Sequence, residues 1–241
     1  MIKEALNYLF NQGIKPADRV VGVEEGNFLV DNEGVGHRLR PIKENRADAA
    51  LHIHTLTGLV DYIKTKERKE ELYVHVVSES KVRLVGTLDI EGEREELAIA
   101  TAKVPSIDFG YFMNTEQLII MLQSSFVANE DRSVLLKVVG NTREENVREA
   151  SDDGVSQKVA IRNGVASTVE VKVPNPVTLA PYRTFLEVAQ PESDFIFRMQ
   201  EGPKGGLFEA DGGMWRNAAI LAIRDYLIKE LEDVADIHII A

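Results

Sequence analysis

The segment between residues 174 and 216 carries the side chains with the most chemistry to offer a ligand. It interleaves aromatic rings with guanidinium, amide and carboxylate groups. Aromatic rings can stack on a planar molecule while polar groups hydrogen-bond its edges. The candidate ligand-binding residues are Tyr182, Arg183, Gln190, Arg198, Asp211 and Trp215. The same pattern would also arise if the aromatic residues formed the core of a sheet and the polar residues its outer face.

Arg183 and Arg198 lie on either side of a turn signal, Gln-Pro-Glu-Ser at residues 190–193. Residues 184–188 and 195–199 have the composition of strands, and the proline between them predicts that they form a pair. Such pairing would bring the two guanidinium groups together, an arrangement that suits a phosphate or a carboxylate. The sequence therefore predicts a site for a nucleotide-type ligand.

Asp211 is followed by two glycines and then by Trp215. An aspartate at this place can cap the helix that is predicted to begin near Met214. Alternatively, the flexible glycines can let the backbone close on a ligand. The sequence leaves both interpretations open.

No pattern in the sequence identifies a catalytic residue. There is no Gly-x-Ser-x-Gly nucleophile element and no Gly-x-x-x-x-Gly-Lys-Ser/Thr phosphate loop. The segment at residues 202–206 resembles such a loop only in composition, because Pro203 stiffens it, and a hairpin loop is predicted instead. Carboxylates such as Asp152 and Asp153 are too common in this chain to mark a site. No cofactor is expected, and catalysis is left open with a preference for a binding role.

His52 and His54 lie two apart on a predicted strand, so both imidazoles share one face. Two histidines on one face can begin a metal site, with His37 or His75 as a further ligand. Histidines that alternate along a half-exposed strand more often belong to a polar face. No metal ligand is therefore assigned.

Composition and charge are those of an ordinary globular protein. The 241 residues are 44% hydrophobic and 28% charged, and the absence of cysteine excludes disulfides and cysteine-ligated metals. The net charge of −11 argues against duplex nucleic acid as a partner. No apolar run approaches the roughly 20 residues of a membrane-spanning helix. The predicted location is the cytoplasm, without membrane association.

The helices and strands that the sequence predicts around the candidate site indicate an α+β fold. We expect mostly antiparallel sheets with three to five helices, including a long C-terminal helix from about residue 214 to residue 230. Two domains are predicted: an N-terminal helix and small meander over residues 1–48, and a main α+β domain over residues 49–241. The other predicted helices cover residues 1–10 and 55–63 or begin near residues 114 and 131, and the predicted strands are 72–77, 82–88, 97–104, 155–162, 165–173, 184–188, 195–199, 207–210 and 237–240.

Two local signals are sharp. Asn114 followed by Gln117 is typical of a helix N-cap with its capping-box partner. Asn163 followed by Gly164 predicts a two-residue hairpin turn, because both residues tolerate the positive φ angles of that turn.

The order of these elements resembles the YfdQ-like family of phage and prophage proteins. The resemblance runs from about residue 50 onward, through the helix before the sheet, the charged middle segment, the Asn163-Gly164 hairpin, and the strand pair that leads to a terminal helix. The residues that carry it include Tyr62, Phe126, Pro174, Pro176 and Phe185. The family implies no catalytic residue. It implies an accessory, early-expressed gene product that acts in the bacterial cytoplasm.

The leading hypothesis is a non-enzymatic phage accessory protein that binds a nucleotide-type molecule, such as a signal of host defence, through the 174–216 region. A second is a single-stranded nucleic-acid or recombination accessory protein that uses local basic pairs such as Arg38 and Arg40. A third is a protein–protein inhibitor or scaffold whose acidic surface docks a host protein. A fourth is a metal-dependent hydrolase. The sequence also leaves open a homo-oligomer.

Overall fold

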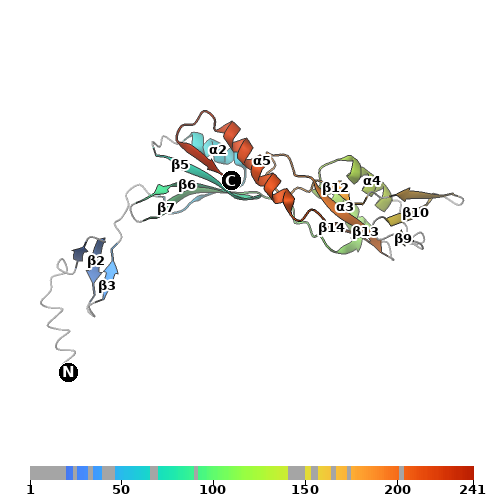
Figure 1. Cartoon of the computed structure of the whole chain (residues 1–241), viewed down its shortest axis with the longest axis horizontal. Helices are drawn as coiled ribbons and strands as arrows, with labels where there is room; N and C mark the ends of the chain where they lie inside the picture. The colour runs from blue at the N-terminus through green and yellow to red at the C-terminus, as the bar shows by residue number, and fades with distance from the viewer. Residues whose placement is uncertain are drawn as a thin grey trace, which may run out of the picture. The chain divides into compact units, whose positions relative to one another are not determined.

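The computed structural model places the chain in two units, Met1–Arg46 and Ala47–Ala241, which are described separately (Figure 1). The described residues are 20–23, 26–31, 35–39, 47–65, 70–89, 92–140, 150–152, 157–163, 167–172, 175–200 and 204–241.

The smaller unit contains an antiparallel meander of three short strands. They are β1 (Val20–Val23), β2 (Gly26–Val30) and β3 (Gly36–Arg38), in the order β1-β2-β3. Asp31 holds the connection after β2, because its Oδ1 accepts a hydrogen bond from the Val35 amide at 2.9 Å. The meander predicted here is confirmed. The predicted helix over residues 1–10 lies outside the described residues.

A five-stranded sheet forms one half of the larger unit. Its strands are β4 (Leu51–Ile53), β5 (Leu72–Ser78), β6 (Lys81–Leu88), β7 (Arg94–Thr101) and β15 (Ile237–Ile240), in the order β15-β5-β6-β7-β4. The three central strands are antiparallel, whereas β15 runs parallel to β5 and β4 runs parallel to β7. Alternation of apolar with polar residues in β5–β7 leaves one face of this sheet apolar.

Two helices cover the apolar face of the five-stranded sheet (Figure 1). They are α2 (Leu56–Lys64) and α5 (Met214–Glu230). Thr55 caps α2, because its Oγ1 accepts a hydrogen bond from the Gly58 amide at 3.1 Å. Leu59 of α2 and Ile223 of α5 are fully buried in the same core as Val74 of β5.

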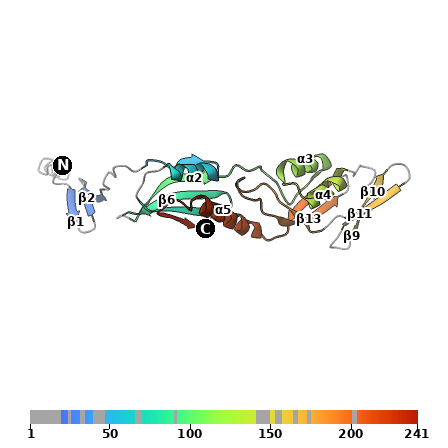
Figure 2. The ribbon, with the colours of Figure 1, turned by 90° about the horizontal axis from the view of Figure 1, so that it is seen from above.

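A second core lies between a four-stranded sheet and two further helices (Figure 2). The strands are β12 (Val177–Leu179), β13 (Ser193–Gln200), β14 (Lys204–Glu209) and β8 (Phe112–Asn114), in the order β12-β13-β14-β8, and the helices are α3 (Thr115–Ser125) and α4 (Glu130–Gly140). The predicted cap of α3 is confirmed, because Asn114 Oδ1 accepts a hydrogen bond from the Gln117 amide at 2.8 Å.

A third sheet of the larger unit contains β9 (Ala150–Asp152), β10 (Gln157–Asn163) and β11 (Ser167–Lys172). The predicted hairpin is confirmed, since β10 and β11 pair antiparallel. The predicted two-residue turn is wrong, because Asn163 pairs with Ser167 and the connection therefore has three residues. Asn163 continues the ladder as the last residue of β10 instead of forming the turn.

The predicted fold class is confirmed: the protein is α+β, its described sheets are mostly antiparallel, and its C-terminal helix has 17 residues. The strand predicted over residues 184–188 is wrong. This stretch lies in the loop between β12 and β13, where the amides of Arg183 and Thr184 bond the side chain of Gln190 instead of another strand. Phe185 and Val188 are buried in the core below the five-stranded sheet while Leu186 is exposed, so the two buried residues are three apart and do not follow the alternation of a strand.

Gly206 on β14 is expected to tolerate no side chain. A Cβ at this position would lie 2.7 Å from the backbone oxygen of Tyr111, which belongs to the segment that leads into β8. Gly206→Ala should therefore lower the free energy of unfolding by about 1–3 kcal/mol in urea denaturation, because backbone must shift. Gly140→Ala is the matched control, since a Cβ there meets no described atom within 4 Å. Equal stability of the two variants would contradict the prediction.

Candidate functional site

The beginning of α5 is fixed by Asp211. Gly213 is the N-cap residue, with φ of 83°, and has no side chain to accept a hydrogen bond. Asp211 supplies the acceptors instead: its Oδ1 accepts from the Gly213 amide at 3.0 Å and its Oδ2 from the Trp215 amide at 3.3 Å. The capping interpretation of Asp211 is therefore what the structure shows, and it brings Trp215 to the end of the four-stranded sheet.

Arg183 stacks on Trp215. Both side chains are buried, and the guanidinium carbon lies 3.8 Å from the centroid of the indole. Nη1 of Arg183 donates to Glu209 at 3.1 Å, and Nη2 donates to the hydroxyl of Ser193. The guanidinium of Arg216 lies 4.7 Å from the same indole centroid. The cation–π capacity of Trp215 is therefore used within the protein.

Burial lowers the pKa of Arg183 to about 10, although the negative charges of Glu209 and Asp211 act in the opposite direction. The positive charge of Arg216 adds to the lowering. The desolvation cost of burying the charged guanidinium is therefore larger than the stabilisation of that charge by Glu209 and Asp211.

Gln190 organises the loop that carries Arg183. Its Oε1 accepts hydrogen bonds from the amides of Arg183 and Thr184 at 3.0 and 3.2 Å, and its Nε2 donates to the Phe185 carbonyl at 3.0 Å. All these contacts are with backbone. Tyr182, half-buried beside Arg183, donates its amide to the Ser125 carbonyl. Gln190 therefore positions Arg183 instead of facing a pocket.

Arg198 lies apart from this group. Ser193, Phe195 and Phe197 are buried on one face of β13, and Arg198 belongs to the alternate set on the other face. Arg183 contacts Ser193 and therefore lies on the face opposite to Arg198. The two guanidinium groups do not form a common anion site, because the strand pairing that would bring them together does not occur.

A pocket of about 350 Å³ opens where α5 meets β12 and β13. Its lining combines three carboxylates and two hydroxyls with the apolar side chains of the first turn of α5. The lining residues are Thr178, Glu192, Ser193, Asp194, Ala210, Asp211, Met214, Trp215 and Ala218. Asp211 and Trp215 are the members that the sequence had suggested. Glu192 and Asp194 were missed, although two acids on either side of Ser193 were a visible signal.

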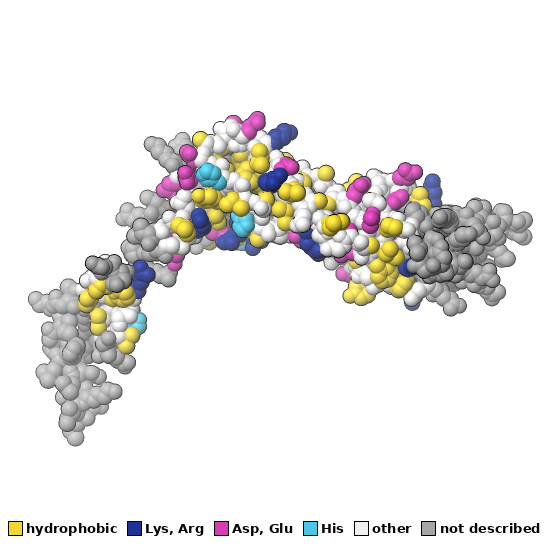
Figure 3. All heavy atoms as spheres, in the orientation of Figure 1, with side chains coloured by type: hydrophobic (Ala, Val, Ile, Leu, Met, Phe, Trp, Pro, Cys, Tyr) yellow, Lys and Arg dark blue, Asp and Glu magenta, His cyan; other side chains and the backbone are white. Residues whose placement is uncertain are grey.

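The pocket is acidic and rich in acceptors. Glu192 and Asp194 are exposed and Asp211 is half-buried. Asp194 Oδ1 accepts from the Thr178 hydroxyl at 2.9 Å, which fixes this carboxylate at the rim. Figure 3 shows acidic side chains gathered over β12 and α4.

Two buried N–H groups beside the pocket have no hydrogen-bond acceptor in the described part of the chain. They are Nε1 of Trp215 and Nε of Arg183. Buried donors are rarely left without an acceptor in native proteins, and exceptions tend to occur at functional sites. This feature adds to the reasons for treating the region around Trp215 as a site.

Within the part of the chain that the structure describes, the histidines are not grouped with other metal ligands. His52 and His54 are exposed, and Nδ1 of His54 lies 3.2 Å from the Thr101 carbonyl oxygen. Among the described residues, no group of three or more histidine, aspartate or glutamate side chains is placed to hold a metal ion. Asp152 belongs to β9, whereas Asp153 lies outside the described residues.

No family model, curated protein or solved structure matches the chain. Within the described ranges, no helix has the length and apolar character needed to cross a membrane.

Proposed function

We propose that this chain is a non-enzymatic binding module of a phage or prophage and that the Trp215 pocket is its recognition site. The observation that carries the proposal is a concave site whose lining combines Glu192, Asp194 and Asp211 with the buried Trp215. Concave sites with an apolar wall and a few convergent polar groups are the usual places where proteins bind ligands.

The charge of the pocket favours a cationic ligand over a nucleotide phosphate. Three carboxylates and no basic residue are among the described residues that line it, and the chain as a whole carries a net charge of −11, which favours a cation over a phosphate even though the guanidiniums of Arg183 and Arg216 lie against the indole. Hydrogen bonds from a charged donor to a carboxylate are about twice as strong as those between neutral groups. The ligand that fits this lining is a lysine or arginine side chain presented by a host protein.

The hydrogen bonds within the pocket favour binding over catalysis. Asp211 accepts from two backbone amides, and the Ser193 hydroxyl accepts from Arg183. A serine nucleophile needs a general base beside it, whereas the hydrogen-bond partner of the Ser193 hydroxyl is the guanidinium of Arg183. The resemblance to YfdQ-like proteins supplies the biological context, an accessory protein that captures a host protein in the bacterial cytoplasm.

A peptide titration tests the proposal. Trp215 is the one tryptophan of the chain and borders the pocket, so its fluorescence reports occupancy. A Gly-Arg-Gly peptide with blocked termini should change the emission. It should bind about tenfold or more tightly than the blocked Gly-Gln-Gly peptide, because glutamine lacks the charged donor of arginine. Isothermal titration calorimetry supplies the affinities. AMP and ATP are titrated under the same conditions.

Charge-neutral variants locate the site. The double variant Glu192→Gln, Asp194→Asn should weaken binding of the arginine peptide about tenfold, since two pocket carboxylates lose their charge. The matched control is Glu116→Gln, Glu130→Gln, which removes two exposed carboxylates at the starts of α3 and α4. Binding of AMP or ATP more tightly than the arginine peptide, or equal losses in the two double variants, would refute the cationic-ligand assignment.

A further inference from the structure

The face of the five-stranded sheet that points away from α2 and α5 carries a row of side chains across all its strands, in which two histidines and an arginine lie among two isoleucines. Strand register places Ile240 beside His75, His75 beside Arg83, Arg83 beside Ile99, and Ile99 beside His52. These residues alternate with the buried ones, so they lie on the outer face. Five strands at about 4.8 Å spacing make this row about 19 Å long.

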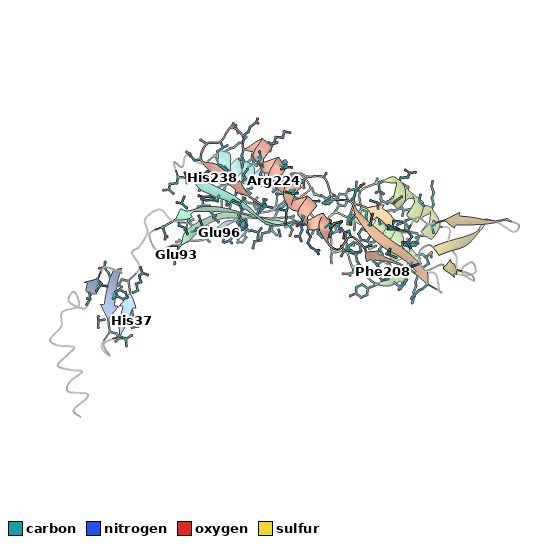
Figure 4. The ribbon with its side chains drawn as sticks, in the orientation of Figure 1. His37, Glu93, Glu96, Phe208, Arg224 and His238 are labelled. Carbon is teal, nitrogen blue, oxygen red and sulfur yellow. The ribbon has the colours of Figure 1, made fainter. Side chains whose placement is uncertain are left out.

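Three of the five histidines of the chain lie on this sheet face, and a fourth, His54, directly follows the end of β4. His52 and His54 come from β4 and the residue after its end, His75 from β5 and His238 from β15, and all four are exposed. Two of them were recognised in the sequence as sharing a face, but His75 and His238 join them only through strand pairing. Figure 4 labels His238 on this part of the molecule.

Aromatic stacking is organised at one end of the same face. The rings of Tyr73 and His238 have centroids 5.2 Å apart and an interplanar angle of 32°, across the parallel β15–β5 pair. The guanidinium carbon of Arg94 lies 5.1 Å from the Tyr73 centroid. A stack of rings with a guanidinium beside it is the arrangement on which proteins place unpaired bases.

Basic side chains lie on the central strands of this sheet. Lys81 and Arg83 belong to β6 and Arg94 to β7, and Arg83 forms an ion pair with Glu96 of β7. Figure 3 shows basic and histidine side chains near β6 and β7. Lys81 and Arg94 lie near the stacked rings of this face, and such cations can attract the phosphates of an anionic partner to a chain whose net charge is −11.

We infer that this sheet face binds single-stranded nucleic acid. An open sheet can stack splayed bases on its aromatic side chains while cations contact the phosphates. Duplex nucleic acid has its bases stacked internally and offers them no access to Tyr73 or His238. The inference is independent of the Trp215 pocket, whose lining comes from other strands and from the start of α5.

Fluorescence anisotropy with labelled oligothymidylate and oligouridylate tests the inference on the full chain. Wild-type protein should bind at low salt and more weakly at physiological salt, because phosphate contacts release counterions. The double variant His75→Glu, Lys81→Glu should weaken binding about tenfold or more, and His238→Ala about threefold or more through lost stacking. Thermal unfolding followed by circular dichroism verifies that each variant is folded.

The matched control is Asn217→Asp, Lys229→Glu on the exposed side of α5, which changes the formal charge by the same three units as His75→Glu, Lys81→Glu with histidine neutral. It should bind within about twofold of wild type, since it leaves the sheet face intact. Four results would overturn the inference: no binding at low salt, equal losses in test and control variants, duplex bound as tightly as single strands, or competition by inorganic polyphosphate as strong as that by oligonucleotide.

Discussion

Phe195→Ala is expected to lower the free energy of unfolding by about 3–5 kcal/mol, because it removes a fully buried aromatic ring. The Phe195 centroid lies 5.0 Å from that of Phe109 and 6.4 Å from that of Phe126. The guanidinium carbon of Arg183 lies 5.9 Å from the Phe195 centroid. The ring therefore joins the core under the four-stranded sheet to the group that supports the Trp215 pocket.

Urea denaturation, followed by circular dichroism and by Trp215 fluorescence, measures the effect. Phe208→Ala is the matched control, because it makes the same substitution at a less buried site. Phe208 is half-buried on the outer face of β14, where its ring packs against that of Phe112. Its expected cost is about 1 kcal/mol. A cost below that value for Phe195→Ala would show that the core under β13 closes over the lost ring, contrary to the prediction.

Elements whose signals are local were predictable from sequence. Thr55 and Asn114 begin helices because their side chains bond amides three residues further on, and both signals lie within one helical turn. The central strands β5, β6 and β7 follow from alternation alone. The long helix α5 was predictable because its residues favour helix and because Gly212 and Gly213 mark the point before which it cannot begin.

Elements that depend on distant partners were not predictable. The parallel pairing of β15 with β5 joins segments far apart in the chain, and no local pattern specifies it. The stretch at 184–188 has strand composition, yet Phe185 is drawn into the helix-side core of the five-stranded sheet and Gln190 satisfies the neighbouring amides. Tertiary burial outweighs strand propensity there.

The candidate site was predictable by region but not by residue. Residue types suggested rings and guanidiniums around an anion, whereas the fold turns Arg183 inward onto Trp215 and places Arg198 on the other face of β13. The pocket wall is then made by carboxylates from β13 and from the turn before α5. The exposed position of Asp194 follows from the strand face on which it lies, since Ser193 and Phe195 of β13 point inward, whereas the burial of Arg183 follows from the path of the loop before β13.

Arg183→Ala is expected to lower the free energy of unfolding by about 2–4 kcal/mol and to shift Trp215 emission to longer wavelength. The variant loses charge-assisted hydrogen bonds to Glu209 and Ser193 and uncovers one indole face. Glu209 is about one-third exposed, so water can hydrate the carboxylate that remains, and the cost falls below that of a fully buried pair.

Arg183→Met separates packing from charge. Methionine can refill part of the space over the indole without a guanidinium. Burial lowers the pKa of Arg183 to about 10, so the charged guanidinium is buried at a desolvation cost that the methionine variant no longer has. Its cost in urea denaturation should therefore be about half that of Arg183→Ala, with emission close to that of wild type. If both variants cost the same and shift the emission equally, the hydrogen bonds to Glu209 and Ser193, and not the stack on Trp215, hold the wall of the pocket in place.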